Sequence, residues 1–267
     1  MLLEFFLSRK RKQQTYDTHD TLANFQVALG AILFGGFASS YALSLYFILF
    51  EQCKSLRIAS LGRESLGWSW YVWPIAIFLE DFTYYWFHRI SHRVRVFWAC
   101  HIVHHSSESF NYSTALRNGW FSVLYKPIFW LWMPAFGFHP LMVITCLSIN
   151  SVYQFFCHTK VGMTWSAWST VFSNPYVHEI HHGKARQHLD KNFGGIFTLF
   201  DRIFGTFHPP CGEEVAYGVT HPPRTNHVVE VIFHEFRDII HELHGSSDWK
   251  TRIQILVKPP DWKKPSL

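Results

Sequence analysis

The 267-residue sequence has few charged residues. Asp, Glu, Lys and Arg together make up 16% of it, against about 25% in an ordinary soluble domain. Aromatic residues make up 18%, and hydrophobic residues 48%. This shortage of charge indicates a membrane protein. The net charge of +5 is modest, and the Lys and Arg residues form no aromatic-interleaved groove, so we expect no nucleic-acid partner.

Cysteine is also sparse and unpatterned. The five cysteines are odd in number and include no CxxC pair, so neither a disulfide framework nor a thiolate zinc site is indicated. Cys100 and Cys157 directly precede histidines, which favours a reducing, cytosol-facing location. No cleavable signal peptide is expected, because the apolar segment 1–8 is short and its basic run follows it.

Four apolar segments are long enough to cross about 30 Å of hydrocarbon or nearly so. The sequence therefore predicts an all-α integral membrane protein with about four transmembrane helices and a histidine-rich cytosolic cap. Residues 121–158 would form a membrane hairpin, which returns the chain to the side it left. Most basic residues outside the segments lie on that side if the N-terminus is cytoplasmic, so the positive-inside rule places the histidines in the cytoplasm. The expected spans are 25–50, 70–87, 120–136 and 141–156.

Three regions are expected along the chain. Residues 1–69 hold the N-terminal segment with the first span, and 70–210 form the catalytic domain. Residues 211–267 form a cytosolic tail. Within that tail, 228–243 has apolar residues at the spacing of an amphipathic helix, which would pack on the cap or lie in the membrane interface.

Nine histidines form the main chemical pattern. They occur as HxxxH, HxxHH, a single histidine and a second HxxHH, and the i, i+3 and i+4 spacings place each group on one helix face. Imidazole binds iron, zinc and copper when it is neutral and oriented through its other nitrogen. Nine rings are too many for one ion but suit two. The proposed ligands are His88, His92, His101, His104, His105, His158, His178, His181 and His182.

Three further polar residues are candidates for supporting these rings. Asp81 falls on the same helical stripe as His88, and Gln154 on that of His158. Glu179 lies inside the last group. Asp81 has an equally good alternative role, which is to anchor its helix through Arg89 or Arg93.

Other metal chemistries fit less well. Residues 178–182 read His-Glu-Ile-His-His, which satisfies the HExxH pattern of zinc proteases, but one zinc ion leaves six clustered histidines unexplained. A carboxylate di-iron bundle needs two ExxH motifs, and only Glu179 to His182 supplies one. A metal transporter would place ligands near the bilayer midplane, whereas these gather at the cytosolic helix ends.

Three histidine motifs, here called boxes, lie at 88–92, 101–105 and 178–182, and the expected membrane hairpin separates the second from the third. In this order and spacing the chain resembles the fatty acid hydroxylase and sterol desaturase superfamily. Residues 105–117, NFGG at 192–195 and FDRIFGTF at 200–207 are most similar to alkylglycerol monooxygenase-like members. The resemblance covers about residues 70–208. It implies a non-haem di-iron centre held by the box histidines and His158, which uses O2 to oxidise a lipid C–H bond.

The resemblance leaves several points open. Alkylglycerol monooxygenases take electrons from tetrahydrobiopterin, and other branches take them from NAD(P)H through a redox partner. Hydroxylation, desaturation and ether cleavage share one oxidant, so the sequence does not separate these three reactions. It also does not distinguish a fatty acyl, sterol or ether-lipid substrate. The expected location is the plasma or inner membrane of a bacterium, or the endoplasmic reticulum of a eukaryote.

Overall fold

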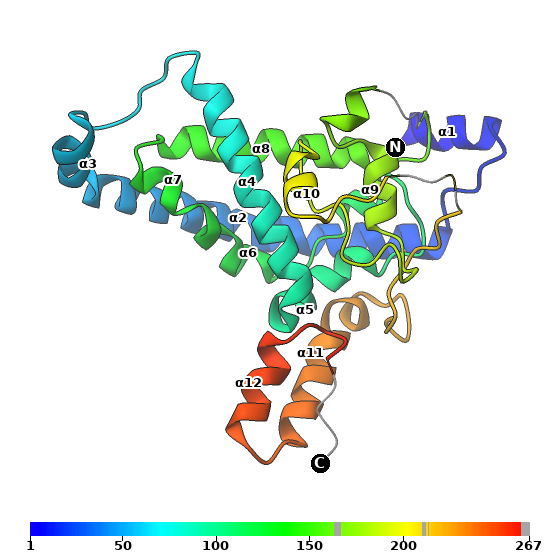
Figure 1. Ribbon diagram of the computed structural model, residues 1–267. Helices are drawn as coiled ribbons and strands as arrows, with labels where there is room; N and C mark the ends of the chain where they lie inside the picture. The colour runs from blue at the N-terminus through cyan, green and yellow to red at the C-terminus, as the bar shows by residue number, and fades with distance from the viewer. Residues whose placement is uncertain (163–166, 210–211, 213, 263–267) are drawn as a thin grey trace.

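The computed structural model describes residues 1–162, 167–209, 212 and 214–262, except the side chains of Phe37 and Ala38. Cys211 and the expected domain boundary at 210–211 lie outside the described residues. The described part is helical (Figure 1), and its only β pairings are two isolated bridges. The α-helices are α1 Leu2–Lys10, α2 Thr18–Gln52, α3 Lys54–Leu61, α4 Val72–Arg93, α5 Arg95–His105, α6 Ser122–Tyr125, α7 Trp132–Ala135, α8 Pro140–Cys157, α9 Pro175–His181, α10 Leu199–Ile203, α11 Val228–His244 and α12 Trp249–Val257. The 3-10 helices are η1 Thr114–Leu116, η2 Lys126–Trp130 and η3 Ala167–Thr170.

Two of the described helices, α2 and α8, are long and apolar enough to cross a membrane. They contain the expected spans 25–50 and 141–156, which are thereby confirmed as helices. Leu29, Ile32 and Leu33 of α2 are each more than 60% exposed. Such a large exposed apolar surface suits contact with lipid better than contact with water.

The long helices α2, α4 and α8 share one end away from the histidines. At that end the ring of His139, which precedes α8, lies 5.5 Å from the Phe50 ring of α2 and 4.8 Å from that of Trp68, just before α4. At the other end, α8 leads into His158, whose Nε2 lies 3.1 Å from that of His104. As expected, residue 158 lies at the end of the bundle that holds the other histidines; whether residues 121–158 cross a membrane stays a prediction.

Residues 120–136 differ from the single span that we expected. They form the short pieces α6, η2 and α7 in place of one continuous helix. Pro127 and Pro134 lie inside this stretch, and proline has no backbone N–H to donate to the preceding turn. The prediction of one continuous helix was wrong here because hydropathy measures apolar length but does not account for the missing donors.

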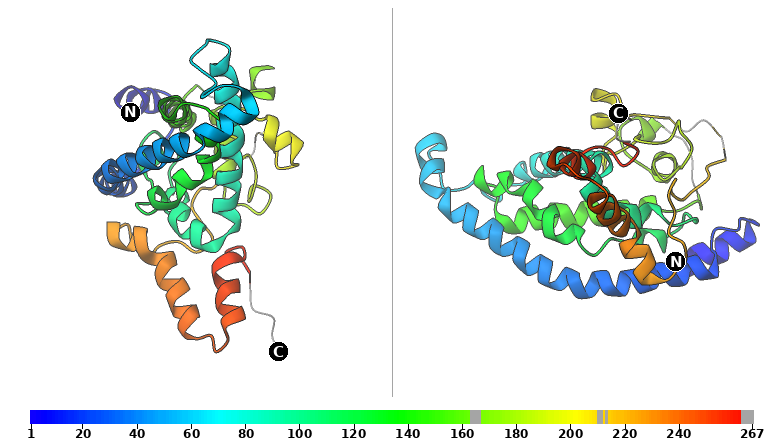
Figure 2. Two further views of the ribbon diagram at one scale, coloured as in Figure 1. Left: turned by 90° about the vertical axis from the view of Figure 1, so that its left-hand side faces the viewer. Right: turned by 90° about the horizontal axis from the view of Figure 1, so that it is seen from below.

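The amphipathic segment 228–243 is confirmed as α11, which pairs with α12 in a hairpin on one side of the bundle (Figure 2). This hairpin packs on α5 through Ile239, Ile255 and Ala99. The contact also includes Arg95 of α5, which donates 2.8 Å to Glu235 and 2.6 Å to Glu242. The C-terminal hairpin is thus attached to the helix that carries His101, His104 and His105.

Arg117 connects the first turn of α2 to the end of α5 in the buried interior. Its guanidinium donates to Asp20 and Asn24 of α2 at 2.9 and 3.0 Å. It also donates to the Ser106 hydroxyl and the Val103 carbonyl, both at 2.9 Å. Arg117 is fully buried and Asp20 is 4% exposed. A buried charge pair of this kind depends on both partners being present.

We predict that Arg117→Met lowers the free energy of unfolding by about 3–5 kcal/mol, because it leaves the Asp20 carboxylate buried without its cation. The double variant Asp20→Asn/Arg117→Met should recover part of that loss. Unfolding of the detergent-solubilised protein by denaturant measures both. Arg237→Met is the matched control, since that arginine is exposed and pairs with the half-buried Glu230 and the exposed Asp238, and it should change stability by less than about 0.5 kcal/mol. Equal losses for the two arginines would contradict the prediction.

Candidate metal centre

All nine histidines of the sequence pattern lie together in the structure. They divide into two groups, and within each group the potential ligand nitrogens lie within 4.8 Å of one another. Every ring is buried except that of His101, which is half-buried. The five-histidine group contains His88, His92, His101, His105 and His181, and the four-histidine group contains His104, His158, His178 and His182.

The five-histidine group draws on three helices. His88 and His92 come from the last turns of α4, His101 and His105 from α5, and His181 from α9. The Nε2 of His101 lies 3.1 Å from that of His88 and 3.2 Å from that of His105. The rings of His88 and His181 have centroids 4.4 Å apart.

The four-histidine group joins the fourth expected span to both HxxHH motifs. His158 follows the last turn of α8, and its Nε2 lies 3.1 Å from the Nε2 of His104 and 3.1 Å from the Nε2 of His178. The His182 ring packs 4.6 Å from that of His104. Each HxxHH motif therefore contributes histidines to both groups, a division that spacing along the sequence did not specify.

Backbone carbonyls fix the tautomer of four rings. The Nδ1 atoms of His88, His104, His158 and His181 lie 2.7–3.2 Å from the carbonyl oxygens of Phe193, Arg117, Gln154 and Lys191. A carbonyl only accepts, so each Nδ1 carries the hydrogen. In a neutral ring the Nε2 is then left with a free lone pair, which is the state that binds a metal.

Burial keeps these rings neutral. It lowers the pKa of His104 to about 4 and that of His181 to about 4. Burial, with repulsion from neighbouring histidines, also holds the pKa of His105, His178 and His182 well below its usual range. A protonated imidazole has no free lone pair, so these shifts favour the ligand form at neutral pH.

The contact between His104 and His158 follows from these assignments. Both rings donate through Nδ1 to a carbonyl, so their Nε2 atoms present two lone pairs to each other at 3.1 Å. No hydrogen bond joins two acceptors. Two nitrogens bound to one metal at about 2.1 Å each lie roughly 3.0–3.4 Å apart. The Nε2 atoms of His92, His181 and His182 are also buried without a hydrogen-bond partner among the described residues. The donor set therefore fits metal ions.

The loop 193–197 supports both groups from outside. Asp81 of α4 accepts hydrogen bonds from the backbone N–H groups of Ile196 and Phe197 at 2.6 and 3.0 Å. Gln154 of α8 donates its side-chain N–H to the Gly195 carbonyl. A side chain at Gly195 would place its Cβ 2.5 Å from a carboxylate oxygen of Asp81, so only glycine permits this close approach.

Asp81 and Gln154 thus act on the rings through the backbone, and their side chains do not contact the ring nitrogens. The loop that Asp81 holds presents the Phe193 carbonyl to His88, and the Gln154 backbone carbonyl accepts from His158. The alternative partners of Asp81 are engaged elsewhere, because Arg89 donates to the Tyr85 hydroxyl and Arg93 to Asp190.

Glu179 lies apart from this support. Its carboxylate accepts from the Tyr217 hydroxyl and lies 3.4 Å from the Lys160 ammonium. His178 and His182 of the HExxH pattern both belong to the four-histidine group. The glutamate between them is therefore committed to a tyrosine and a lysine.

Sequence reasoning missed the carbonyls of Phe193, Arg117 and Lys191 as partners of the rings, since a backbone acceptor leaves no side-chain signal. It also missed Asp201, which accepts from the N–H groups of Phe193 and Gly194, both at 2.8 Å. The glycines at 194–195 were the available clue that a backbone segment packs closely at this point.

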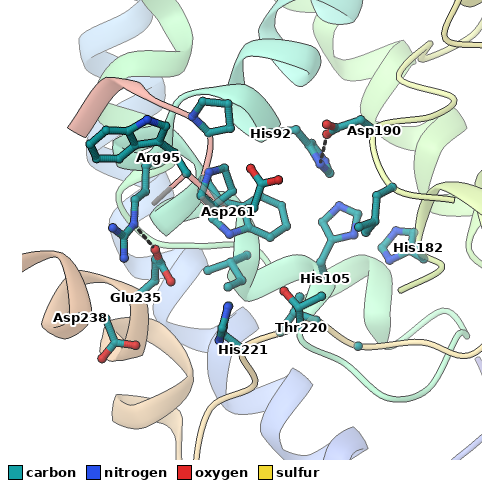
Figure 3. A pocket seen from close by; sticks show the side chains of 18 of the residues that line it. His92, Arg95, His105, His182, Asp190, Thr220, His221, Glu235, Asp238 and Asp261 are labelled. Carbon is teal, nitrogen blue, oxygen red and sulfur yellow. Dashed lines mark hydrogen bonds and ion pairs between the residues drawn. The ribbon is translucent and has the colours of Figure 1, made fainter. Parts of the chain in front are cut away.

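A pocket of about 520 Å³ opens beside the five-histidine group. His92, His105, His181 and His182 form its inner wall. Its outer wall comes from α11 and the segments 218–221 and 259–262, which follow the last histidine motif in the sequence. Figure 3 shows Asp261 between the Arg95–Glu235 pair and the histidines. The rings are therefore reachable from this side.

Comparisons with known proteins agree with this geometry. An alkylglycerol monooxygenase of Homo sapiens is 34% identical over 226 residues, which is 85% of this chain and 49% of the relative. An ornithine lipid hydroxylase of Rhizobium tropici is 25% identical over 62% of the chain and 54% of the relative. Cholesterol 25-hydroxylase of Homo sapiens is 28% identical over 49% of the chain and 48% of the relative. The chain spans about half the length of these relatives, and no solved structure matches it significantly.

The model of the fatty acid hydroxylase family matches residues 73–206. That range begins at the start of α4 and ends just after α10, so it contains all nine clustered histidines and the loop 193–197. The expected resemblance is thereby confirmed, and the chain belongs to the fatty acid hydroxylase family.

Proposed function

We propose that this protein is a membrane-bound, non-haem di-iron oxidoreductase that uses O2 to hydroxylate a C–H bond of a lipid. One observation carries the proposal: two adjacent groups of neutral imidazoles direct their free lone pairs inward. The family match and the names of the relatives, which are monooxygenases and hydroxylases acting on lipids and sterols, support it.

Each group would hold one ion. The five-histidine group offers five neutral nitrogen donors and the four-histidine group offers four, and imidazole is a suitable ligand for iron. Asp81 and Gln154 would orient the rings without binding metal, and Glu179, which is bound by Tyr217 and Lys160, would lie outside the donor set. When bound, the iron pair supplies the activation of O2 that an unactivated C–H bond requires.

The chain itself would orient the donors and exclude water. The carbonyls of Arg117 and Gln154 hold the protons of His104 and His158 on Nδ1, away from the site. Phe110, which is 1% exposed, covers the four-histidine group with its ring 5.6 Å from that of His158. An apolar cover of this kind protects a reactive centre from side reactions with water.

Hydroxylation of a lipid consumes one O2 and two electrons with two protons, and it releases one water. We propose that an external donor supplies the electrons, either tetrahydrobiopterin or NAD(P)H through an electron-transfer partner. The substrate is a fatty acyl, sterol or ether lipid of the bilayer, and desaturation or ether cleavage are the alternative outcomes of the same oxidation.

We also propose a multi-pass topology with the site facing the cytoplasm. In this arrangement α4 and the segment 120–136 lie in the membrane with α2 and α8. Their shared end at His139 then lies on the opposite side from the histidines. The membrane is the plasma or inner membrane in a bacterium and the endoplasmic reticulum in a eukaryote.

Zinc protease and metal transport are the rival functions. The protease would need Glu179 to activate water, whereas this carboxylate is bound by Tyr217 and paired with Lys160. A transporter would need ligands at mid-membrane, and these lie at helix ends. Neither rival function explains why a second group of buried imidazoles lies beside the first.

The direct test of the function is isotopic labelling. Membranes containing the protein, supplied with 18O2 and a reductant, should yield a lipid that carries one 18O atom, and H2 18O should not label it. The variant Glu179→Gln should retain most of this activity, because it keeps all nine imidazoles. An unlabelled lipid pool, with peptide cleavage that the variant abolishes, would establish the protease instead.

We predict that His104→Ala abolishes lipid oxidation and reduces the metal content from two ions per chain toward one, since it removes a donor from the four-histidine group only. Elemental analysis of purified protein measures the metal independently of turnover. His244→Ala is the control, because this exposed histidine ends α11 outside both groups. Full metal content and turnover in the His104 variant would refute its assignment as a ligand.

A further prediction concerns Asp81. Asp81→Asn replaces one of two acceptor oxygens with a donor, so the N–H groups of Ile196 and Phe197 compete for one acceptor and the loop that orients His88 loosens. Iron affinity should fall roughly 10–100-fold, as measured by competition with a chelator. Glu64→Gln, an exposed residue at the opposite end of the bundle, serves as control. Unchanged iron affinity would show that the loop does not depend on Asp81.

A further inference from the structure

The pocket beside the five-histidine group has an unbalanced charge. Apart from its histidines, one guanidinium, that of Arg95, faces five carboxylates. Arg95 is already satisfied by Glu235 and Glu242. The remaining carboxylates are Asp190, Asp238 and Asp261. A pocket with this charge favours a cationic group and disfavours a phosphate.

The three remaining carboxylates differ in their partners. Asp190 pairs with Arg93 at 2.6 Å, and Asp238 lies 3.3 Å from the Arg237 guanidinium. Asp261 forms no hydrogen bond or ion pair with any described residue. It is exposed, and Figure 3 shows it in the middle of the pocket. Asp261 is therefore the carboxylate that is free to receive a ligand.

Two half-buried indoles complete the lining. Trp262 follows Asp261 directly, and Trp98 lies with its ring 4.9 Å from that of His92 and 5.6 Å from that of His105. Aromatic faces beside a carboxylate attract ammonium groups through the negative charge of the ring face. The volume of about 520 Å³ is in the usual range for a small-molecule site.

The inner wall of the pocket connects it to the metal centre. His92, His181 and His182 line it, are at most 8% exposed, and have Nε2 atoms without hydrogen-bond partners among the described residues. A molecule held by Asp261 and the indoles would thus lie against the proposed metal ligands. The pocket is continuous with the reacting centre and is not a separate surface feature.

We propose that this pocket is the headgroup subsite of the lipid substrate and that it selects a headgroup bearing an ammonium group, with Asp261 as counter-ion and Trp98 and Trp262 as the aromatic wall. This inference rests on the proposed function, since it assigns the polar part of the same substrate. It also places the oxidised carbon close to the headgroup, because the ammonium lies beside His92 and His105. The far end of the lipid's hydrocarbon chain is then remote from the proposed metals.

Binding tests the proposal without turnover. The full-length metal-loaded protein in uncharged detergent would be titrated with a 1-O-alkylglycerol and with the same molecule carrying an amine in place of its terminal hydroxyl. We expect the amine to bind about tenfold more tightly. Asp261→Asn should reduce this preference to about twofold or less and leave the affinity for the neutral lipid unchanged. Glu64→Gln, an exposed carboxylate far from the pocket, should keep the full preference.

Two further measurements identify the source of the ammonium and separate this inference from the function. Ethanolamine without a chain should compete only at concentrations at least a hundredfold above the amine lipid, and competition at equal concentration would overturn the headgroup assignment. Equal affinity for the amine and neutral lipids, or a preference unaffected by Asp261→Asn, would overturn the subsite. In that event, retained iron content and 18O labelling would leave the proposed function standing.

Discussion

The structure depends on one electrostatic constraint: nine neutral imidazoles must lie side by side with their lone pairs directed toward one another. His104 and His158 show the problem most plainly, because both Nε2 atoms are acceptors and yet lie 3.1 Å apart. Without a cation this contact is repulsive, so the protein must use other interactions to hold the rings in place. Backbone carbonyls do so by accepting the Nδ1–H bonds, which also sets the tautomer that leaves Nε2 free.

Those carbonyls are in turn fixed by the packing of the bundle. The Phe193 carbonyl belongs to a loop that Asp81 of α4 and Gln154 of α8 both hold. The Arg117 carbonyl belongs to a residue whose guanidinium binds Asp20 of α2. The apolar helices therefore do more than anchor the chain. Their relative positions determine where the acceptors lie, so a disturbance far from the rings reaches the site through the backbone.

The sequence predicted which histidines would cluster, because imidazoles at i, i+3 and i+4 share one helix face whatever the tertiary structure. It could not divide them into groups. His104 and His105 are adjacent along the chain but belong to different groups, and that separation depends on where α8 and α9 deliver His158 and His178. The carbonyl partners could not be predicted either, since a backbone acceptor is present at every residue. The broken helix at 120–136 did have a sequence signal in Pro127 and Pro134, which a reading of hydropathy alone leaves out.

The two histidine groups differ in how many of their rings border the pocket. Phe110 packs against His158, His178 and His182, and of the four-histidine group only His182 borders the pocket. In the five-histidine group His92, His105 and His181 all border it. The proposed reaction requires room for an incoming molecule beside a metal, so in that proposal the substrate approaches from the five-histidine side. Helix α11 and the segment 259–262 line the outer side of this pocket and lie outside residues 73–206. In the proposed function, this part of the chain is therefore the best placed to determine which lipid is accepted.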